Sequence, residues 1–291
     1  MTKKINYLSR KTRESLINYF KKIIEIIKKP EMGVLPGQLA FFILLSIVPI
    51  FTFVGYGAGI FNINMDTLLK FLDGVIPGGA SNIIPYLMGN TFDFKLALLS
   101  IWMLYLAGNG FNSVILISNQ IYGLNQSNWL KRRIKATFMT VGTVIMLILM
   151  LIIPVFGSKL LNAISSLVIY ETIKKIYGML KVPFMILILF LFIRMLYGVS
   201  PDRVRKHSHL ASGSIFTTIG WTFVTWIYSL IANNMATYNI FYGALANVAF
   251  LMIWLYAISL IFVVGMSLNY GREIEEQVME ETGAVKIVKK H

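Results

Sequence analysis

Polar side chains within long apolar segments are the residues of this chain whose type and position point to chemistry. Arg194 is the only charged residue in the apolar segment from Val182 to Val199. Its planar guanidinium can bind a lipid phosphate through two parallel hydrogen bonds. In that case Arg194 should face a cavity open to the cytoplasmic leaflet, with Arg203 and Arg205 at its basic mouth. The alternative is an anchor whose side chain reaches the membrane surface and binds nothing specific.

Side-chain amides form a second polar set. Those of Asn109, Asn112, Asn119 and Gln120 project from one face of a helix, because offsets of 3, 10 and 11 residues return to nearly the same direction. Such amides either join helices by hydrogen bonds worth about 1 kcal/mol each or line a polar groove. With Gln38 of the first apolar segment added, the candidate lipid-binding residues are Gln38, Asn109, Asn112, Asn119, Arg194, Arg203 and Arg205.

Groups that perform catalysis or bind metals are few. The chain has 3 histidines and no cysteine, and His207 and His209 stand among basic residues whose charge disfavours both protonation and metal binding. No carboxylate lies inside an apolar segment, and no glycine-rich phosphate loop joins a strand to a helix. The sequence therefore predicts a protein that is not an enzyme and that uses neither a metal nor a cofactor.

The apolar segments themselves define the fold class. No charged residue or histidine occurs from Leu210 to Gly271, a stretch that suits two membrane-spanning helices joined by the polar turn at 233–239. Other apolar stretches can each hold about 20 helical residues, the length that crosses a hydrocarbon core of about 30 Å. We predict an all-α polytopic membrane protein with six transmembrane helices, near 37–60, 96–123, 137–156, 182–199, 211–231 and 242–270.

The chain has a net charge of +14. Its basic residues are concentrated in every second segment between the spans rather than in one patch. Lys and Arg gather before Pro36, after the second span and after the fourth, whereas the intervening segments carry nearly balanced charge. This pattern predicts that both termini lie in the cytoplasm. Basic residues without interleaved aromatic side chains do not suggest nucleic acid, so the expected partners are anionic membrane lipids. The oligomeric state is left open.

Segments outside the spans have patterns of their own. The apolar and polar residues of 16–29 fall on opposite faces of a helix that ends at Pro30. This amphipathic helix either lies on the inner membrane surface or binds a partner. Short apolar runs within residues 66–90 predict external helices parallel to the membrane, because they are too short to span it. We expect a cytoplasmic amphipathic segment at 1–35, a transmembrane domain at 36–271 and a cytoplasmic tail at 272–291.

Four short segments resemble the YihY/BrkB family of bacterial inner-membrane proteins. They lie at residues 39–49 (LAFFILLSIVP), 119–123 (NQIYG), 197–203 (YGVSPDR) and 242–245 (YGAL) with Trp254-Leu255-Tyr256 following. The chain departs from the family in its last span, where Ser267 stands in place of a glutamate. The resemblance implies six spans and cytoplasmic termini. The family once carried a ribonuclease label, and some members have been linked to movement of lipids across the inner membrane.

Two functions are compatible with these patterns. The first is an inner-membrane protein that binds and translocates an anionic lipid or a lipid-linked molecule. The alternative is a membrane scaffold that transports nothing and recruits partners through its N-terminal helix and C-terminal tail. A groove lined by Asn109, Asn112 and Arg194 would favour the first function, and a tightly packed bundle the second.

Overall fold

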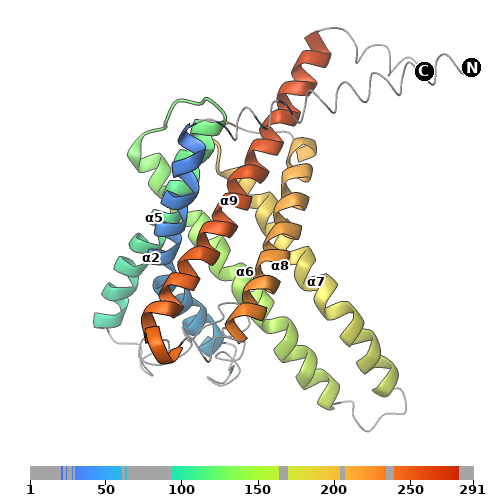
Figure 1. Ribbon diagram of the computed structural model, residues 1–291. Coiled ribbons are helices and arrows are strands. Elements are labelled where there is room, and N and C mark those ends of the chain that lie inside the picture. The colour runs from blue at the N-terminus through green and yellow to red at the C-terminus, as the bar shows by residue number, and fades with distance from the viewer. Residues whose placement is uncertain are drawn as a thin grey trace, which may run out of the picture.

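Helices account for nearly all of the ordered secondary structure. The computed structural model describes residues 30–60, 94–163, 170–203, 207–233 and 239–281, together with Lys21, Ile24, Lys28 and Ile63. No strand occurs in these ranges. The elements are α2 (Pro30–Ile60), α5 (Phe94–Ile121), α6 (Trp129–Ala163), α7 (Tyr170–Val199), the 3₁₀ helix η2 (His207–Leu210), α8 (Ala211–Asn233) and α9 (Asn239–Glu281) (Figure 1).

Proline and glycine mark two of the helix ends. Pro30 is the first residue of α2, a position where its missing N–H leaves no hydrogen bond unmade. Gly123 follows α5 with a φ of 63°, a left-handed conformation that glycine adopts without strain. Backbone bonds from Leu124 N to Asn119 O (2.8 Å) and from Gly123 N to Gln120 O (3.2 Å) complete a Schellman motif. The chain is thereby turned back toward α6.

Four helices of the described part are long and apolar enough to cross a membrane, namely Trp129–Ile153, Tyr170–Val199, Ala211–Ile231 and Ala249–Glu273. The protein is therefore a multi-pass helical membrane protein. The spans at α2 and α5 remain predictions. The fourth span differs from its expected start at residue 182, because α7 is continuous from Tyr170 through Pro183.

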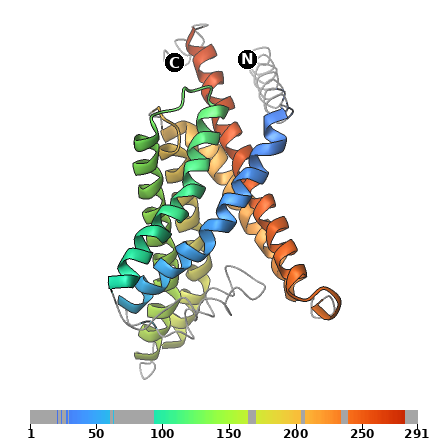
Figure 2. The ribbon, with the colours of Figure 1, turned by 90° about the vertical axis from the view of Figure 1, so that its left-hand side faces the viewer.

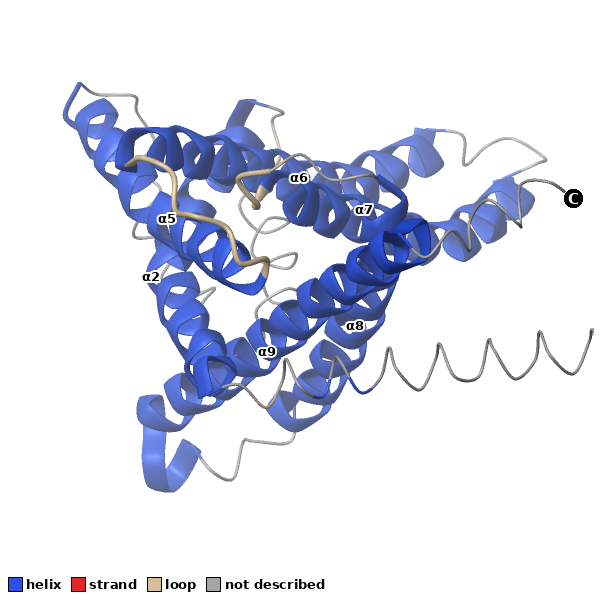
Figure 3. Ribbon diagram, turned by 90° about the horizontal axis from the view of Figure 1, so that it is seen from above, coloured by secondary structure: helices blue, strands red, loops and turns tan. Residues whose placement is uncertain are grey.

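The six long helices form a closed ring. Each packs against the next in the order α2, α5, α6, α7, α8, α9, and α9 packs back against α2. Viewed along the bundle, α2 with α5, α6 with α7, and α8 with α9 enclose a central region on three sides (Figure 3). Figure 2 shows α2 crossing the bundle obliquely beside α9. The ring brings side chains of all six helices toward one interior.

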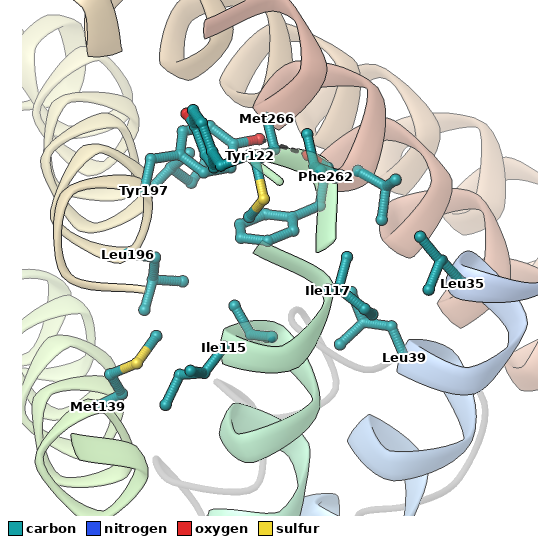
Figure 4. Close-up of a cluster of buried hydrophobic side chains, with 14 of the residues drawn as sticks. Leu35, Leu39, Ile115, Ile117, Tyr122, Met139, Leu196, Tyr197, Phe262 and Met266 are labelled. Carbon is teal, nitrogen blue, oxygen red and sulfur yellow. Dashed lines mark hydrogen bonds between the residues drawn. The ribbon is translucent and has the colours of Figure 1, made fainter. Parts of the chain in front are cut away.

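Apolar side chains fill this interior and also cover the outside. Leu39, Ile115, Met139, Tyr197 and Met266 are almost completely buried in one cluster that joins α2, α5, α6, α7 and α9 (Figure 4). Large apolar side chains are also common on the outer faces, where Phe138 is 72% exposed and Ile219 65%. Such a surface suits hydrocarbon rather than water.

Several predicted segments lie outside the described residues. These are most of the amphipathic helix at 16–29, of which Lys21 and Ile24 are helical, and the external helices at 66–90. The division of the chain at 35/36 and 271/272 also stays a prediction. Helix α9 runs without interruption through residue 271 to Glu281, so the first part of the expected tail continues the last span.

Candidate functional site

Positive side chains gather where α6 and α8 begin and α5 and α7 end, which we call the basic end and which lies uppermost in Figure 1. Lys131, Arg132, Arg133 and Lys135 occupy the first turns of α6, and Arg203 follows α7. The chain holds them together because the Schellman turn after α5 and the Ser200-Pro201 segment after α7 meet at this end.

Asp202 is the centre of a hydrogen-bond network at the basic end. Its Oδ2 accepts hydrogen bonds from Asn119 Nδ2 (2.5 Å) and from the backbone N–H of Ser127 (3.2 Å). Its own backbone N–H donates to Asn119 Oδ1 at 2.9 Å. Lys135 Nζ forms an ion pair with Asp202 Oδ1 at 3.0 Å. We call Asn119, Ser127, Lys135 and Asp202 the Asp202 network. It joins the end of α5, the start of α6 and the segment after α7.

The ion pair at the centre of the network is shielded from solvent. The side chains of Lys135 and Asp202 are 17% and 8% exposed. Lys135 Nζ also donates to the carbonyl oxygens of Ser200 and Pro201, each at 2.8 Å. Burial alone would raise the pKa of Asp202, but hydrogen bonds from Asn119, Lys135 and Ser127 outweigh it and lower the pKa to about 2. Asp202 is therefore a carboxylate at physiological pH.

A groove of about 890 Å³ lies beside the network, between α6 and α7. Four cationic residues and one carboxylate line it, the cations being Lys131, Lys135, Arg194 and Arg203. Apolar side chains complete the wall, among them Ile134, Phe138, Leu191 and Met195, and Phe138 and Leu191 stand furthest along α6 and α7 from the basic end. We call this the basic groove. Because Phe138 and Leu191 are exposed on the outer face, the groove opens toward the membrane as well as toward the basic end.

The predicted site residues are divided by the structure. Arg194 and Arg203 both line the basic groove, whereas Arg205 lies outside the described residues. Gln38 is exposed, away from this groove, and Asn119 belongs to the Asp202 network. Asn109 and Asn112 are not among the residues that line this groove with Arg194.

Asn109 has a different partner that sequence reasoning missed. Arg133 Nη1 donates to Asn109 Oδ1 at 2.8 Å, and its Nη2 donates to the carbonyl oxygen of Tyr105. The guanidinium carbon lies 3.5 Å from the centre of the Tyr105 ring. This cation–π contact and the two hydrogen bonds hold the charge of Arg133 against α5.

Lys131, Lys135 and Asp202 were also missed as site residues, because loop charges were assigned to topology alone. A signal for them exists in the sequence. Two of the segments that resemble the family, NQIYG and YGVSPDR, contain Asn119 and Asp202 respectively. The structure pairs these two segments through Asn119 and Asp202. Within the described residues, no group of three or more histidines or acids is placed to hold a metal ion.

A second polar cluster lies inside the bundle, between α7, α8 and α9. The hydroxyl of Tyr197 donates to the carbonyl oxygen of Phe262 at 2.8 Å and lies 2.6 Å from Thr217 Oγ1. Nearby, Asn269 Oδ1 accepts a hydrogen bond from Gly213 N at 2.8 Å. A Cβ on Gly213 would overlap the carbonyl oxygen of Gly265, so the two backbones touch directly. We call this the α8–α9 interface.

The fold and its groove define a multi-pass helical membrane protein with a positively charged end. The model of the family described as virulence factor BrkB matches residues 24–286. The chain therefore belongs to the BrkB family, in agreement with the resemblance of its four short segments.

Similar curated proteins carry general names. The chain is 24% identical over 239 residues to the putative ribonuclease-like protein YfkH of Bacillus subtilis, covering 80% of this chain and 87% of that protein. It is 24% identical over 246 residues to a UPF0761 membrane protein of Chromobacterium violaceum, covering 79% of this chain and 55% of the relative. A shorter match, 30% identical over 84 residues, links it to the UPF0761 membrane protein of Idiomarina loihiensis. No solved structure matches the chain.

Proposed function

We propose that this protein binds an anionic lipid of the cytoplasmic leaflet in the basic groove and moves it across the inner membrane. The carrying observation is the composition of the groove, in which the cations lie nearer the loops than Phe138 of α6 and Leu191 of α7, which are apolar. A membrane lipid has the same order of chemistry, a charged headgroup followed by hydrocarbon.

The cations of the groove differ in what they can offer a headgroup. Lys135 is already held by Asp202 and two backbone carbonyls. Lys131 and Arg203 are exposed and attract anionic headgroups at about 1 kcal/mol per charge near the surface. Arg194 is half-buried and lies deeper along α7 than Arg203, so it is our candidate for the bidentate phosphate contact.

Transport is the second part of the proposal. It is supported by the family resemblance, some members having been linked to lipid movement, and by the opening of the groove toward the membrane. A ribonuclease activity, suggested only by the name of a relative, receives no support from the groove. The competing function is a scaffold, for which lipid binding in the groove is unnecessary.

Orientation is tested first, because the proposal requires the basic end to face the cytoplasm. The chain has no cysteine, so single cysteines at Asn90 and Asn125 report their side of the membrane without background. Asn125→Cys lies in the exposed turn after α5 and should react with a membrane-impermeant maleimide only in broken cells. Asn90→Cys should react in intact cells. The reverse labelling would contradict the proposed orientation.

Lipid binding is tested by titrating purified protein in detergent with a fluorescent phosphatidylglycerol. Arg194→Ala should weaken binding about tenfold or more, since charge-assisted hydrogen bonds contribute about 1.5–3 kcal/mol. Arg194→Lys should recover only part of it, because an ammonium group cannot form the bidentate contact. Arg272→Ala removes an exposed charge of α9 outside the groove and is the matched control. Equal binding by all variants in folded form would leave Arg194 an anchor and favour the scaffold.

The transport step is tested in vesicles that contain the protein and a trace of the same fluorescent lipid. Dithionite, which bleaches only the outer leaflet, measures how fast the lipid crosses. Wild-type protein should accelerate crossing, and Arg194→Ala should slow it. Binding without accelerated crossing would reduce the proposal to a lipid-binding protein that does not transport.

A further inference from the structure

A partly open cavity of about 210 Å³ lies in the middle of the ring, and we call it the central chamber. Side chains from all six long helices line it, among them Ile43 of α2, Phe111 of α5, Met146 of α6, Trp221 of α8 and Phe262 of α9. It shares no lining residue with the basic groove, which lies on the other face of α6 and α7. The chamber is thus a separate feature of the bundle.

The polar side-chain atoms at its wall are few, and all but one have a hydrogen-bond partner in the same helix or in a neighbouring one. Ser46 Oγ donates to the carbonyl oxygen of Phe42 (2.7 Å), and Thr143 Oγ1 donates to that of Met139 (2.8 Å). Ser259 is fully buried and its hydroxyl has no partner. A serine in a helix can turn its hydroxyl to the carbonyl four residues earlier, so Ser259 does not require a polar ligand.

Water is a poor occupant of such a space. A buried water needs about two to four polar partners, and the chamber offers one hydroxyl that is not engaged elsewhere. An engineered apolar cavity of about 150 Å³ stays dry and binds benzene or xenon. The central chamber, at about 210 Å³, exceeds that size. Its walls favour an apolar guest.

The depth of the chamber in the membrane indicates which apolar molecule can occupy it. Thr143 and Ser259 stand near the middle of the candidate spans Trp129–Ile153 and Ala249–Glu273. At that depth the surrounding solvent is lipid hydrocarbon, and moving a chain from bilayer to chamber involves no change of polarity. A void leaves its lining without dispersion contacts, and a hydrocarbon chain restores them. Filling the chamber should therefore stabilise the ring.

We infer that the central chamber is a binding site for one acyl chain of a membrane lipid. The inference does not rest on the proposed function, because it concerns the hydrocarbon part of a lipid and a site that the headgroup groove does not share. A chain bound there would hold the six helices at a fixed spacing, and its departure would allow them to close.

Photochemical labelling tests this directly. The full-length protein is reconstituted in phosphatidylglycerol vesicles in which a few per cent of the lipid carries a diazirine midway along one acyl chain. After irradiation, peptide mass spectrometry locates the adducts. We expect adducts on Leu255 and Phe262, which are 1% and 2% exposed and face the chamber. Adducts on the lipid-facing Phe138 serve as the internal reference for ordinary lipid contact.

Filling variants supply the contrast. Ser259→Phe should lower the adducts on Leu255 and Phe262 at least fivefold and leave those on Phe138 unchanged. Thr143→Leu fills the chamber from the opposite wall and should act in the same direction, which covers the case in which Ser259→Phe does not fold. Ser259→Ala removes the hydroxyl but leaves the space, so its adducts should match the wild type. The inference is wrong if wild-type adducts are confined to lipid-facing residues, or if chamber adducts survive in a folded filling variant.

Discussion

The Asp202 network and the α8–α9 interface stabilise buried polar groups in opposite ways. The Asp202 network uses a full ion pair, with Lys135 and Asp202 at 3.0 Å, at the end of the bundle where loops meet. The α8–α9 interface uses only neutral groups. The hydroxyls of Tyr197 and Thr217 contact each other, the Tyr197 hydroxyl donates to the backbone of α9, and the amide of Asn269 accepts from the backbone of α8. The first joins loops to helices, and the second joins α7, α8 and α9 to one another.

The two sets differ in whether they lie just outside or just inside the ends of the helices. A charge at the centre of a span costs about 2.5–3.5 kcal/mol, and less toward the ends. The Asp202 network lies just after α7, where water and headgroups reduce that cost. The α8–α9 interface lies within the last turns of the candidate spans, with Tyr197 and Gly213 two residues from the ends of α7 and α8, and there close backbone approach and neutral hydrogen bonds hold the helices together. Each solution should therefore respond to a different perturbation.

The largest effect is expected at the α8–α9 interface. A side chain on Gly213 would overlap the carbonyl oxygen of Gly265 and approach Asn269 Cγ to 2.6 Å. The backbone there cannot yield without separating the two helices. Gly213→Leu should therefore destabilise the protein by about 3 kcal/mol or more, or prevent folding altogether. Thermal unfolding in detergent, with size-exclusion profiles as a check on folding, measures it.

Gly178 of α7 supplies the matched control. A Cβ there meets nothing within 4 Å. Gly178→Leu should be neutral or stabilise the helix by about 0.5–1 kcal/mol, because leucine has a higher helix propensity than glycine. Equal tolerance of substitution at Gly213 and Gly178 would mean that α8 and α9 are not in direct backbone contact.

A smaller effect is expected from Asp202→Asn, which removes the ion pair with Lys135. The change leaves a buried ammonium group without its counter-ion, so we expect a loss of about 2 kcal/mol in the free energy of unfolding. The wild type should also be sensitive to acid. The pKa of Asp202 in the folded state is about 2, below its ordinary value of 3.8. The unfolded chain therefore binds the proton first, and stability is lost as pH falls from about 4 to about 2.

Unfolding transitions of both proteins between about pH 6 and pH 2 measure this difference. The wild type should approach the variant as the pH falls, and the variant should show the flatter profile. The exposed pair of Lys174 with Glu171, at 3.8 Å, is the control. Glu171→Gln should change stability by less than about 0.5 kcal/mol, as is usual for surface ion pairs. A parallel acid response in wild type and Asp202→Asn would assign the network no role in stability.

The helical fold followed from the sequence because hydropathy acts over whole segments. The uncharged stretch from Leu210 to Gly271 predicted two helices with a turn near 233–239, and α8 and α9 end and begin at Asn233 and Asn239. Helix lengths were predicted less well. The start of α7 at Tyr170 was missed because Lys174 and Lys175 were assigned to a loop, although lysines in a terminal turn can extend toward the membrane surface.

The site was harder to predict, because its members come from distant segments. Arg194 and Arg203 are close in sequence and both line the groove. Lys131 joins them only through the packing of α6 on α7, a contact that no local pattern encodes. Asn119 shares a helical face with Asn109 and Asn112. Because it lies in the last turn of α5, its side chain contacts Asp202 in the segment after α7 instead of the neighbours of the other two amides. The periodicity of a sequence indicates which face of a helix a side chain lies on, but it does not indicate which residue of another segment that side chain contacts.

The smallest effect is expected from Tyr197→Phe, which removes one hydroxyl from the α8–α9 interface and keeps the ring. That hydroxyl contacts Thr217 Oγ1 and the carbonyl oxygen of Phe262, and the side chain is fully buried. Interhelical hydrogen bonds inside membranes contribute about 0.6 kcal/mol on average and about 1.7 at most. Thr217 can compensate in part, because its hydroxyl also lies 3.5 Å from the carbonyl oxygen of Ile261. We therefore expect a loss of about 1 kcal/mol, with no dependence on pH.

Tyr256→Phe is the control for this change, since Tyr256 lies on α9 and is 42% exposed. It should leave the unfolding transition where it is. If Tyr197→Phe proved as damaging as Gly213→Leu, the hydroxyl rather than backbone contact would hold α8 against α9, and the contrast between close packing and polar bonding at this interface would be reversed. If it proved neutral, Gly213 and Gly265 would suffice, and the buried tyrosine would act through the packing of its ring on Phe262, whose centre lies 4.7 Å away.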